Sequence, residues 1–245
     1  MGYAAATEYS VGTVVPGEGA LMIRPKFKQS RQGVMFVHGA GSDATYCIRP
    51  EGKQAELTQL VAADGFTAYS GDNGGPQTWG NVTAIARMGS GQAYLQGQGV
   101  KGDKIALVSA SMGGLVSLNW AAQNKAKVSC IVSVIPVINV TDIHTNNRGG
   151  SAAAINAAYS GGWSQATYGA VHNPRTLATA GKFSGIPMLI FYGLTDTLCM
   201  PAETEAFAAS VGSSVELVAM PSGHDFTSYG LADHPRIIEF LNEHN

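Results

Sequence analysis

The sequence predicts an α/β fold with a mostly parallel central sheet, and three observations support this prediction. Short apolar runs alternate along the chain with longer stretches that are compatible with helices. Runs that are wholly or almost wholly apolar, such as Val34–Val37 and Ile131–Ile135, are typical of strands buried on both faces. Glycine supplies 31 of the 245 residues, which fits a fold with many tight turns. Parallel strands joined by helices imply right-handed crossovers, with helices on both faces of the sheet.

The expected elements can be placed in order along a single domain spanning residues 1–245. Two antiparallel strands are expected first, at 14–15 and 20–23, and the parallel strands follow at 34–37, 66–69, 105–108, 131–135, 188–192 and 215–219. Helices are expected at 51–63, 82–96, 115–124, 201–211 and 234–243. The connection 139–185 is longer than one crossover helix needs. We interpret it as a small lid-like insert between the sixth and seventh strands, over the carboxyl edge of the sheet; an ordinary helical connection is the alternative.

Composition and charge exclude several function classes. Hydrophobic residues make up 45% of the chain and charged residues 13%, which argues against global disorder. The net charge is −2 and the 15 Lys and Arg residues are scattered, so no nucleic-acid partner is expected. The first ten residues show no signal peptide, and no run in the sequence reaches the roughly 18 apolar residues of a membrane span. This predicts a cytoplasmic protein or one exported by another route, although a removed leader stays open.

The three cysteines do not form a disulfide framework. No pair of them has the spacing of metal ligands, and no metal site is expected. A bridge between Cys47 and Cys199 is one alternative. The simpler expectation is that Cys47, Cys130 and Cys199 are small buried hydrophobes.

A nucleophile motif follows the apolar run Ile105–Val108. The chain continues as Ser109-Ala110-Ser111-Met112-Gly113-Gly114 and then shows a helical pattern. This arrangement resembles the nucleophile elbow of the α/β-hydrolase superfamily, Gly-x-Ser-x-Gly, in which a serine occupies a sharp turn between strand and helix. Ser111 is the candidate nucleophile at the apex. Ser109 stands where the family usually has glycine and is the rival nucleophile.

Two later strands also end in residues that could complete a catalytic triad. The strand 188–192 is followed by Gly193-Leu194-Thr195-Asp196, and the strand 215–219 by a turn containing Gly223 and His224. The order Ser111, Asp196, His224 is that of the superfamily. Asp142 is the rival acid, and Asp196 could instead cap the helix near Pro201.

The remaining histidines, aspartates and aromatics have less specific roles. Asp225 is expected to cap a helix or to hydrogen-bond locally. The other histidines outside the motifs are interpreted as surface or loop residues; they are His144, His172, His234 and His244. Five aromatic residues either line a pocket or pack ordinarily; they are Tyr46, Trp79, Tyr159, Trp163 and Tyr168.

The run Val34–Val37 followed by His38-Gly39-Ala40-Gly41 resembles the oxyanion loop of the same superfamily. The resemblance implies that the backbone N–H groups of Ala40 and Met112 bind the oxyanion. It also implies structural roles for His38, Gly39 and Gly113, although His38 is a candidate base on the sequence alone. Glycines beside Ala40 allow the backbone to approach a substrate closely.

The combined resemblance covers residues 34–245 and implies a serine hydrolase that acts on a small or lipid-like carboxylic ester through an acyl-enzyme, without a cofactor. The same triad also suits a thioester or amide hydrolase or an acyltransferase. A non-catalytic binding or structural module, of the kind found in phage particles, is the alternative from another class. The sequence leaves the oligomeric state open.

Overall fold

The chain folds around one eight-stranded sheet in the computed structural model, which describes residues 7–26 and 31–244. The strand order is β1-β2-β4-β3-β5-β6-β7-β8. The antiparallel part consists of β1 (Thr7–Val15), β2 (Glu18–Pro25) and the pairing of β2 with β4 (Thr67–Gly71). All other pairings are parallel. Beyond β4, each strand pairs with the next in the order β3 (Gly33–Val37), β5 (Ile105–Ala110), β6 (Val128–Val134), β7 (Met188–Gly193) and β8 (Val215–Met220). The expected α/β class with a mostly parallel sheet is confirmed.

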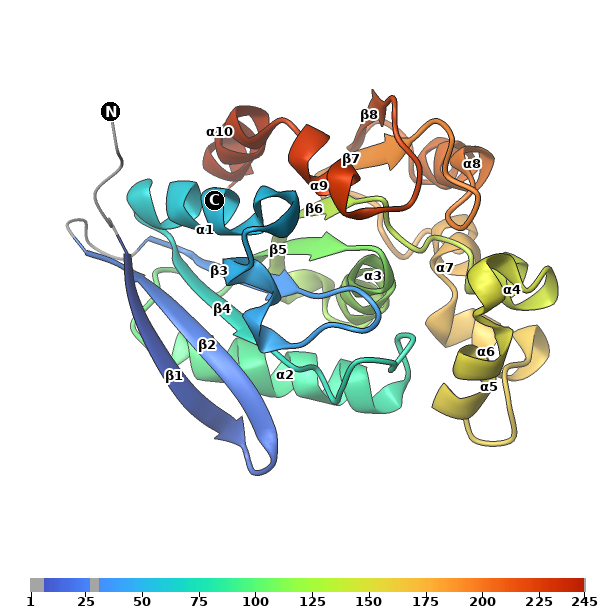
Figure 1. Ribbon diagram of the computed structural model, residues 1–245, viewed down its shortest axis with the longest axis horizontal. Coiled ribbons are helices and arrows are strands. Elements are labelled where there is room, and N and C mark those ends of the chain that lie inside the picture. Colours follow the sequence, from blue (N-terminus) through green and yellow to red (C-terminus); the bar gives the residue numbers. More distant parts are fainter. Residues whose placement is uncertain (1–6, 27–30, 245) are drawn as a thin grey trace.

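Helices cover both faces of the sheet (Figure 1). One face carries α1 (Gln54–Ala63) and α10 (His234–His244), and the other carries α2 (Val82–Gln96), α3 (Met112–Gln123) and α8 (Pro201–Val211). The side chains of strand β3 contribute to two hydrophobic cores, one on each face of the sheet. Val34 and Phe36 pack with α1 and α10, whereas Met35 and Val37 pack with α2 and α3. Successive side chains of a strand point to opposite faces, so both faces of an apolar strand are buried.

Some helices differ in extent from the prediction, for local backbone reasons. The expected helix at 51–63 begins as a short 3-10 turn, η2 (Glu51–Lys53), because Gly52 and Lys53 have φ values of 64° and 59°. Helix α3 begins at Met112, before the expected Leu115, because the turn at Ser111 leads directly into it. No apolar period predicts η1 (Ala44–Ile48), η3 (Lys125–Lys127) or α9 (Phe226–Leu231), because short elements hold too few positions for one.

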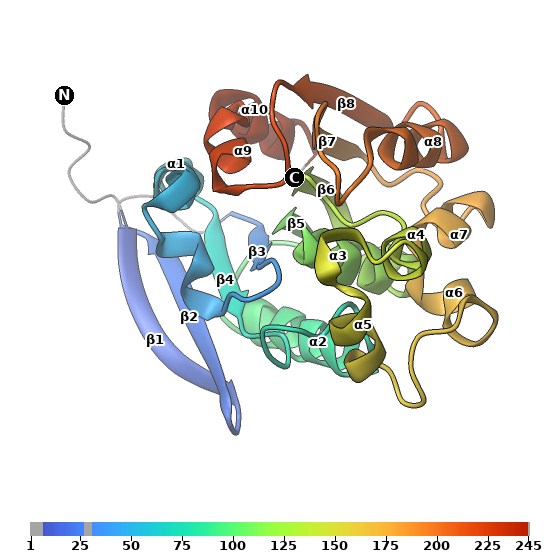
Figure 2. The same cartoon turned by 45° about the vertical axis from the view of Figure 1, so that its right-hand side comes forward.

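The connection between β6 and β7 contains α4 (Val140–Thr145), η4 (Arg148–Gly150), α5 (Ala152–Ala158), α6 (Gln165–His172) and α7 (Pro174–Thr179). These helices lie at the end of the molecule opposite the β1–β2 hairpin (Figures 1 and 2). Tyr159 and Trp163 from this segment share an apolar cluster with Met112 and Leu115. The segment therefore covers the start of α3, and its interpretation as a lid-like insert stays a prediction.

Candidate active site

Ser111 forms a sharp turn between β5 and α3. Strand β5 ends at Ala110 and α3 begins at Met112, which leaves Ser111 alone in the turn. Its φ of 51° and ψ of −121° lie outside the regions that L-amino acids favour. Such strain persists only where the surrounding structure holds it, and it is common at functional sites.

Two glycines after Ser111 make this turn possible. A Cβ at Gly113 would lie 2.1 Å from the carbonyl oxygen of Val37, and a Cβ at Gly114 would lie 2.5 Å from the Cβ of Pro136. Any side chain at either position would therefore displace backbone or proline atoms. Gly113 lets the first turn of α3 pack directly against the end of β3, and Gly114 lets it pack against Ser133 and Pro136 at the end of β6.

Ser109, the rival nucleophile, is buried within the sheet. Its residue surface is 1% exposed, and its hydroxyl lies 2.9 Å from the Ser133 Oγ on β6. It also donates to the carbonyl oxygen of Val132 at 3.3 Å. The structure thus places Ser109 in a polar contact between strands and leaves Ser111 as the serine at the turn.

A hydrogen-bonded chain joins the three residues that the motifs single out. The Ser111 Oγ lies 2.8 Å from the His224 Nε2, and the His224 Nδ1 lies 2.8 Å from the Asp196 Oδ2. If Nδ1 donates its proton to the carboxylate, then Nε2 is free to accept the proton of the serine hydroxyl. The structure therefore brings together Ser111, His224 and Asp196 in the geometry of a nucleophile, a base and an orienting acid.

Asp196 is held in place from its own loop. Its Oδ1 accepts hydrogen bonds from the backbone N–H groups of Leu198 and Cys199, each at 2.8 Å. Its side chain is fully buried, whereas that of His224 is 17% exposed. The alternative that Asp196 caps the helix near Pro201 is wrong, because Leu198 and Cys199 precede α8 and no side chain caps that helix. One carboxylate oxygen orders the loop and the other faces His224.

The rival acid Asp142 has other partners. Its carboxylate forms an ion pair with Arg148 at 2.5 Å and accepts a hydrogen bond from the Asn146 side chain at 2.7 Å. It lies in the first turn of α4, where Asn139 is the capping residue. The structure therefore assigns Asp142 to the local order of the β6–β7 connection and not to His224.

The loop after β3 lies directly beside Ser111. A Cβ at Gly39 would lie 3.3 Å from the Cβ of Ser111. The buried His38 ring spans two backbone segments, with its Nδ1 2.9 Å from the Gly39 carbonyl oxygen and its Nε2 2.9 Å from that of Asp72. These contacts fit the expected structural role of His38. Met112 is the first residue of α3, where a backbone N–H has no acceptor within the helix.

A pocket of about 340 Å³ adjoins Ser111 and His224. The loop residue Ala40 lines it, as do Tyr46, Ile135 and Tyr229. Arg49 and Asp225 add charged groups to the same lining. Burial raises the pKa of both tyrosine hydroxyls, so both stay protonated near neutral pH. The pocket is thus a mixed surface with apolar walls and a few polar groups, as small-molecule sites usually are.

Three of these lining residues have no signal in the sequence. Ile135 has a φ of 44°, which is rare for a β-branched residue, and nothing in the sequence around it marks this strain. Tyr229 lies on α9, whose six residues are too few for a periodic pattern. Arg49 follows the 3-10 turn η1. Asp225 caps α9 by accepting from the N–H groups of Thr227 and Ser228, so its expected capping role is confirmed.

The aromatic residues of the β6–β7 connection pack together instead of lining this pocket. Tyr159 contacts the rings of Trp163 and Tyr168, each with centroids 4.8 Å apart, and its hydroxyl donates to the Trp79 carbonyl oxygen at 2.7 Å. Of the five aromatic candidates, Tyr46 is the one that lines the Ser111 pocket. The other four belong to the apolar cluster that packs the connection against Met112 and Leu115 of α3.

The three cysteines are buried, and none of them forms a disulfide bond within the described residues. No bridge joins Cys47 to Cys199, so that alternative is wrong and the simpler expectation of buried thiols holds. Cys199 nevertheless lies close to the triad. Its sulfur, a carboxylate oxygen of Asp196 and a ring nitrogen of His224 lie within 4.8 Å of one another.

Comparison with known proteins gives this site a family. The model of the prolyl oligopeptidase family matches residues 73–244, which include Ser111, Asp196 and His224. The chain belongs to the prolyl oligopeptidase family. No curated protein matches the sequence. Within the described residues, no helix of this prolyl oligopeptidase family member is long and apolar enough to cross a membrane.

Solved structures of several hydrolases share the fold. An S-formylglutathione hydrolase from Agrobacterium tumefaciens is 12% identical, with a TM-score of 0.74 over 100% of this chain and 98% of that chain. An esterase from Pyrococcus furiosus is 18% identical, with a TM-score of 0.71 over 98% and 93%. A puromycin-hydrolyzing peptidase from Mycobacterium tuberculosis is 16% identical, with a TM-score of 0.76 over 100% of this chain but 40% of that chain. The expected membership of the α/β-hydrolase superfamily is confirmed.

Proposed function

We propose that this protein is a serine hydrolase that cleaves carboxylic esters of small molecules. The observation that carries the proposal is the hydrogen-bonded chain from Ser111 through His224 to Asp196 at the edge of a pocket. Members of the prolyl oligopeptidase family and the superfamily use such chains to activate a serine.

The proposed reaction begins with attack of the Ser111 Oγ on the ester carbonyl carbon. His224 takes the serine proton at Nε2, and Asp196 stabilises the resulting imidazolium through Nδ1. His224 then gives that proton to the leaving alcohol, which leaves an acyl group on Ser111. Water, deprotonated by His224, releases the acid and restores the serine.

The negative charge on the carbonyl oxygen needs donors that are already in place. The backbone N–H groups of Ala40 and Met112 are the proposed donors, because Ala40 lines the pocket and Met112 directly follows Ser111. Losing one such donor costs roughly 10²–10³ in rate in comparable enzymes. Gly39 and Gly113 keep the two segments close enough for both donors to reach one oxygen.

Peptide bond hydrolysis is the second candidate, because the matching family is a peptidase family and one similar structure is a peptidase. The ester is the first candidate because two of the similar structures are esterases, one from Pyrococcus furiosus and one from Pseudomonas putida.

A substrate panel distinguishes these candidates. The panel contains p-nitrophenyl esters of increasing acyl length, a thioester, and aminoacyl and dipeptidyl p-nitroanilides. We expect the highest kcat/KM on a short or medium ester and little turnover of the anilides. A higher kcat/KM on an anilide would replace the ester proposal with the peptidase. No turnover of any substrate, with no reaction of Ser111 with a fluorophosphonate, would favour the binding module.

A further inference from the structure

The thiol of Cys199 gives the Asp196–His224 pair a third potential metal ligand. The three donor atoms lie within 4.8 Å of one another, and within residues 7–26 and 31–244 no other group of His, Cys, Asp or Glu side chains has three donors this close. Asp196 and Cys199 are buried, and the backbone N–H of Cys199 anchors the Asp196 carboxylate. The group is therefore preorganised by the same turn that holds the triad.

One carboxylate, one imidazole and one thiolate form a suitable set for Zn²⁺. Zinc takes four ligands from these types at roughly 2.0–2.3 Å, and three protein ligands leave one position for water. Donor atoms around such an ion are about 3–4 Å apart, so a shift of about 1 Å would complete the site. The occupied site would also carry no net charge, because the two positive charges of Zn²⁺ equal the two negative charges of the carboxylate and the thiolate.

We propose that Asp196, Cys199 and His224 form an inhibitory site for a thiophilic divalent cation such as Zn²⁺. The ion would bind the His224 Nδ1, which faces Asp196. The imidazole proton then resides on Nε2, and this nitrogen cannot accept the proton of Ser111. The inhibition rests on the proposed hydrolase function, whereas the binding of the ion does not.

Binding releases one proton. Burial, with a smaller contribution from Asp196, raises the pKa of the Cys199 thiol well above its ordinary value, so without metal the sulfur carries its proton. The ion displaces that proton to solvent as the sulfur–metal bond forms, as thiol ligands generally require.

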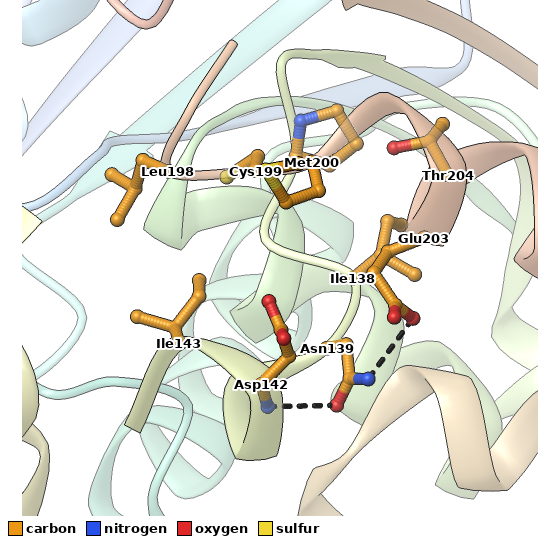
Figure 3. A pocket seen from close by; sticks show the side chains of 10 residues that line it. Ile138, Asn139, Asp142, Ile143, Leu198, Cys199, Met200, Glu203 and Thr204 are labelled. Atoms are coloured by element: carbon orange, nitrogen blue, oxygen red, sulfur yellow. Dashed lines mark hydrogen bonds between the residues drawn. The ribbon is translucent and has the colours of Figure 1, made fainter. Parts of the chain in front are cut away.

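Cys199 also lines a second hollow, which shares no lining residue with the substrate pocket. The hollow is a small space between α4 and the start of α8, of about 10 Å³, which is close to the room one water needs (Figure 3). Its lining includes the carboxylates of Asp142 and Glu203 and no cationic side chain. Figure 3 shows the Asp142 carboxylate turned toward Cys199 and Met200. Both carboxylates are paired with arginines, Asp142 with Arg148 and Glu203 with Arg175, so the proposed site rests on the three donor atoms and not on this hollow.

The test uses Zn²⁺ for inhibition and Co²⁺ for detection, with three matched variants: Cys199→Ser, Cys47→Ser and Cys130→Ser. All three replace a buried thiol, but only Cys199 adjoins the triad. We expect Zn²⁺ to inhibit the parent and the Cys47→Ser and Cys130→Ser variants alike. Cys199→Ser should need at least about tenfold more Zn²⁺ for the same inhibition. Mutating a residue that only hydrogen-bonds to a metal ligand already lowers metal affinity by about this factor, and losing the ligand itself should lower it at least as much. Each rate is normalised to that of the same variant in chelator.

Cobalt binding gives a readout that does not depend on turnover. We expect Co²⁺ to produce a thiolate-to-metal absorption band in the parent that Cys199→Ser lacks and the two control variants keep. The band would support the site even if no ester were cleaved. Equal Zn²⁺ sensitivity of Cys199→Ser and the parent, or a cobalt band that survives in Cys199→Ser, would overturn the proposal. Absence of both inhibition and the band in the parent would overturn it as well.

Discussion

Ser111 and Ser109 show how one backbone position separates a nucleophile from a structural hydroxyl. Both are serines at the end of β5, two residues apart. Ser109 still pairs with Ser133 within the parallel ladder, so its hydroxyl stays between strands. Ser111 lies beyond the last paired residue, where positive φ turns its side chain toward His224. The chemistry therefore depends on where the strand ends.

Substitution of the two candidate acids, Asp196 and Asp142, should have contrasting effects. Asp196→Asn should lower kcat by about 10⁴, because an amide in place of the carboxylate favours the wrong tautomer of His224. Asp142→Asn should leave kcat close to that of the parent and reduce stability through loss of its pair with Arg148. Steady-state kinetics and urea denaturation of both variants provide the measurement. An inactive Asp142→Asn enzyme beside a normal Asp196→Asn enzyme would reverse the assignment.

At the scale of elements, the elbow depends on the close approach of α3 to β3. Gly113→Ala places a methyl group 2.1 Å from the Val37 carbonyl oxygen, so we expect loss of folded protein or of measurable turnover. Gly89→Ala is the matched control. Gly89 lies inside α2, and a Cβ there would come no nearer than 3.8 Å to the Trp120 Nε1.

The control variant Gly89→Ala should therefore be more stable than the parent, whereas Gly113→Ala should be less stable. Alanine is favoured over glycine in a helix interior by roughly 0.5–1 kcal/mol, so Gly89→Ala should raise the free energy of unfolding by about that amount and keep full activity. Urea denaturation and kcat/KM of the two variants test this. A stable and active Gly113→Ala enzyme would show that the backbone at the elbow is looser than the structure implies.

The aromatic cluster of the β6–β7 connection leads to a prediction about stability. Trp163 is 7% exposed and packs on Tyr159 and Tyr168. Trp163→Ala should cost about 3–5 kcal/mol, the usual cost of removing a buried large aromatic side chain. The acyl-length preference of the remaining folded enzyme should stay that of the parent, because Trp163 does not line the Ser111 pocket. A changed preference with unchanged stability would restore Trp163 to the pocket wall.

Elements with strong patterns could be predicted from the sequence, and short ones could not. The bounds of α2 and α8 agree with the prediction, and all eight strands overlap it, because apolar runs and proline positions carry that information. The 3-10 turn η1 and helix α9 supply Tyr46 and Tyr229 to the pocket, but each is only five or six residues long. Asp43 and Asp225 cap these two elements through local hydrogen bonds. Such bonds do not produce a periodic pattern of apolar residues in the sequence.

At the scale of the whole molecule, the sequence indicates where the candidate site lies more clearly than how it is shaped. Ser111, Asp196 and His224 each follow a strand, and parallel strands bring such ends to one edge of the sheet. The pocket beside Ser111 is lined by residues far apart in the sequence, such as Tyr46, Ile135 and Tyr229, so its shape depends on long-range contacts. The nearness of Cys199 to His224 likewise appears only after folding.

Two histidines interpreted as surface or loop residues are in fact largely inside the molecule. His234 is 6% exposed, and burial lowers the pKa of its imidazole and that of His172. The unfolded chain, with an imidazole pKa of about 6.5, then takes up protons before the folded chain does. The contribution of these two histidines to the free energy of unfolding is therefore fully present above about pH 6.5 and decreases as the pH drops below that value.

This dependence can be measured by urea denaturation between about pH 7.5 and 5.5. We expect the denaturation midpoint of the parent to fall over this range and that of His234→Gln to fall less, since glutamine does not titrate. An equal decline in both proteins would mean that His234 is protonated as readily in the folded chain as in the unfolded chain.

The central claim is that Ser111 is an activated nucleophile, and covalent labelling by a fluorophosphonate tests it most directly. Mass spectrometry of the labelled protein and its peptides should show one added group, located on Ser111. The label should be absent in Ser111→Ala and present in Ser109→Ala, and ester turnover should fall by about 10⁶ only in the former. A label on Ser109, or undiminished turnover by a Ser111→Ala protein, would contradict the account.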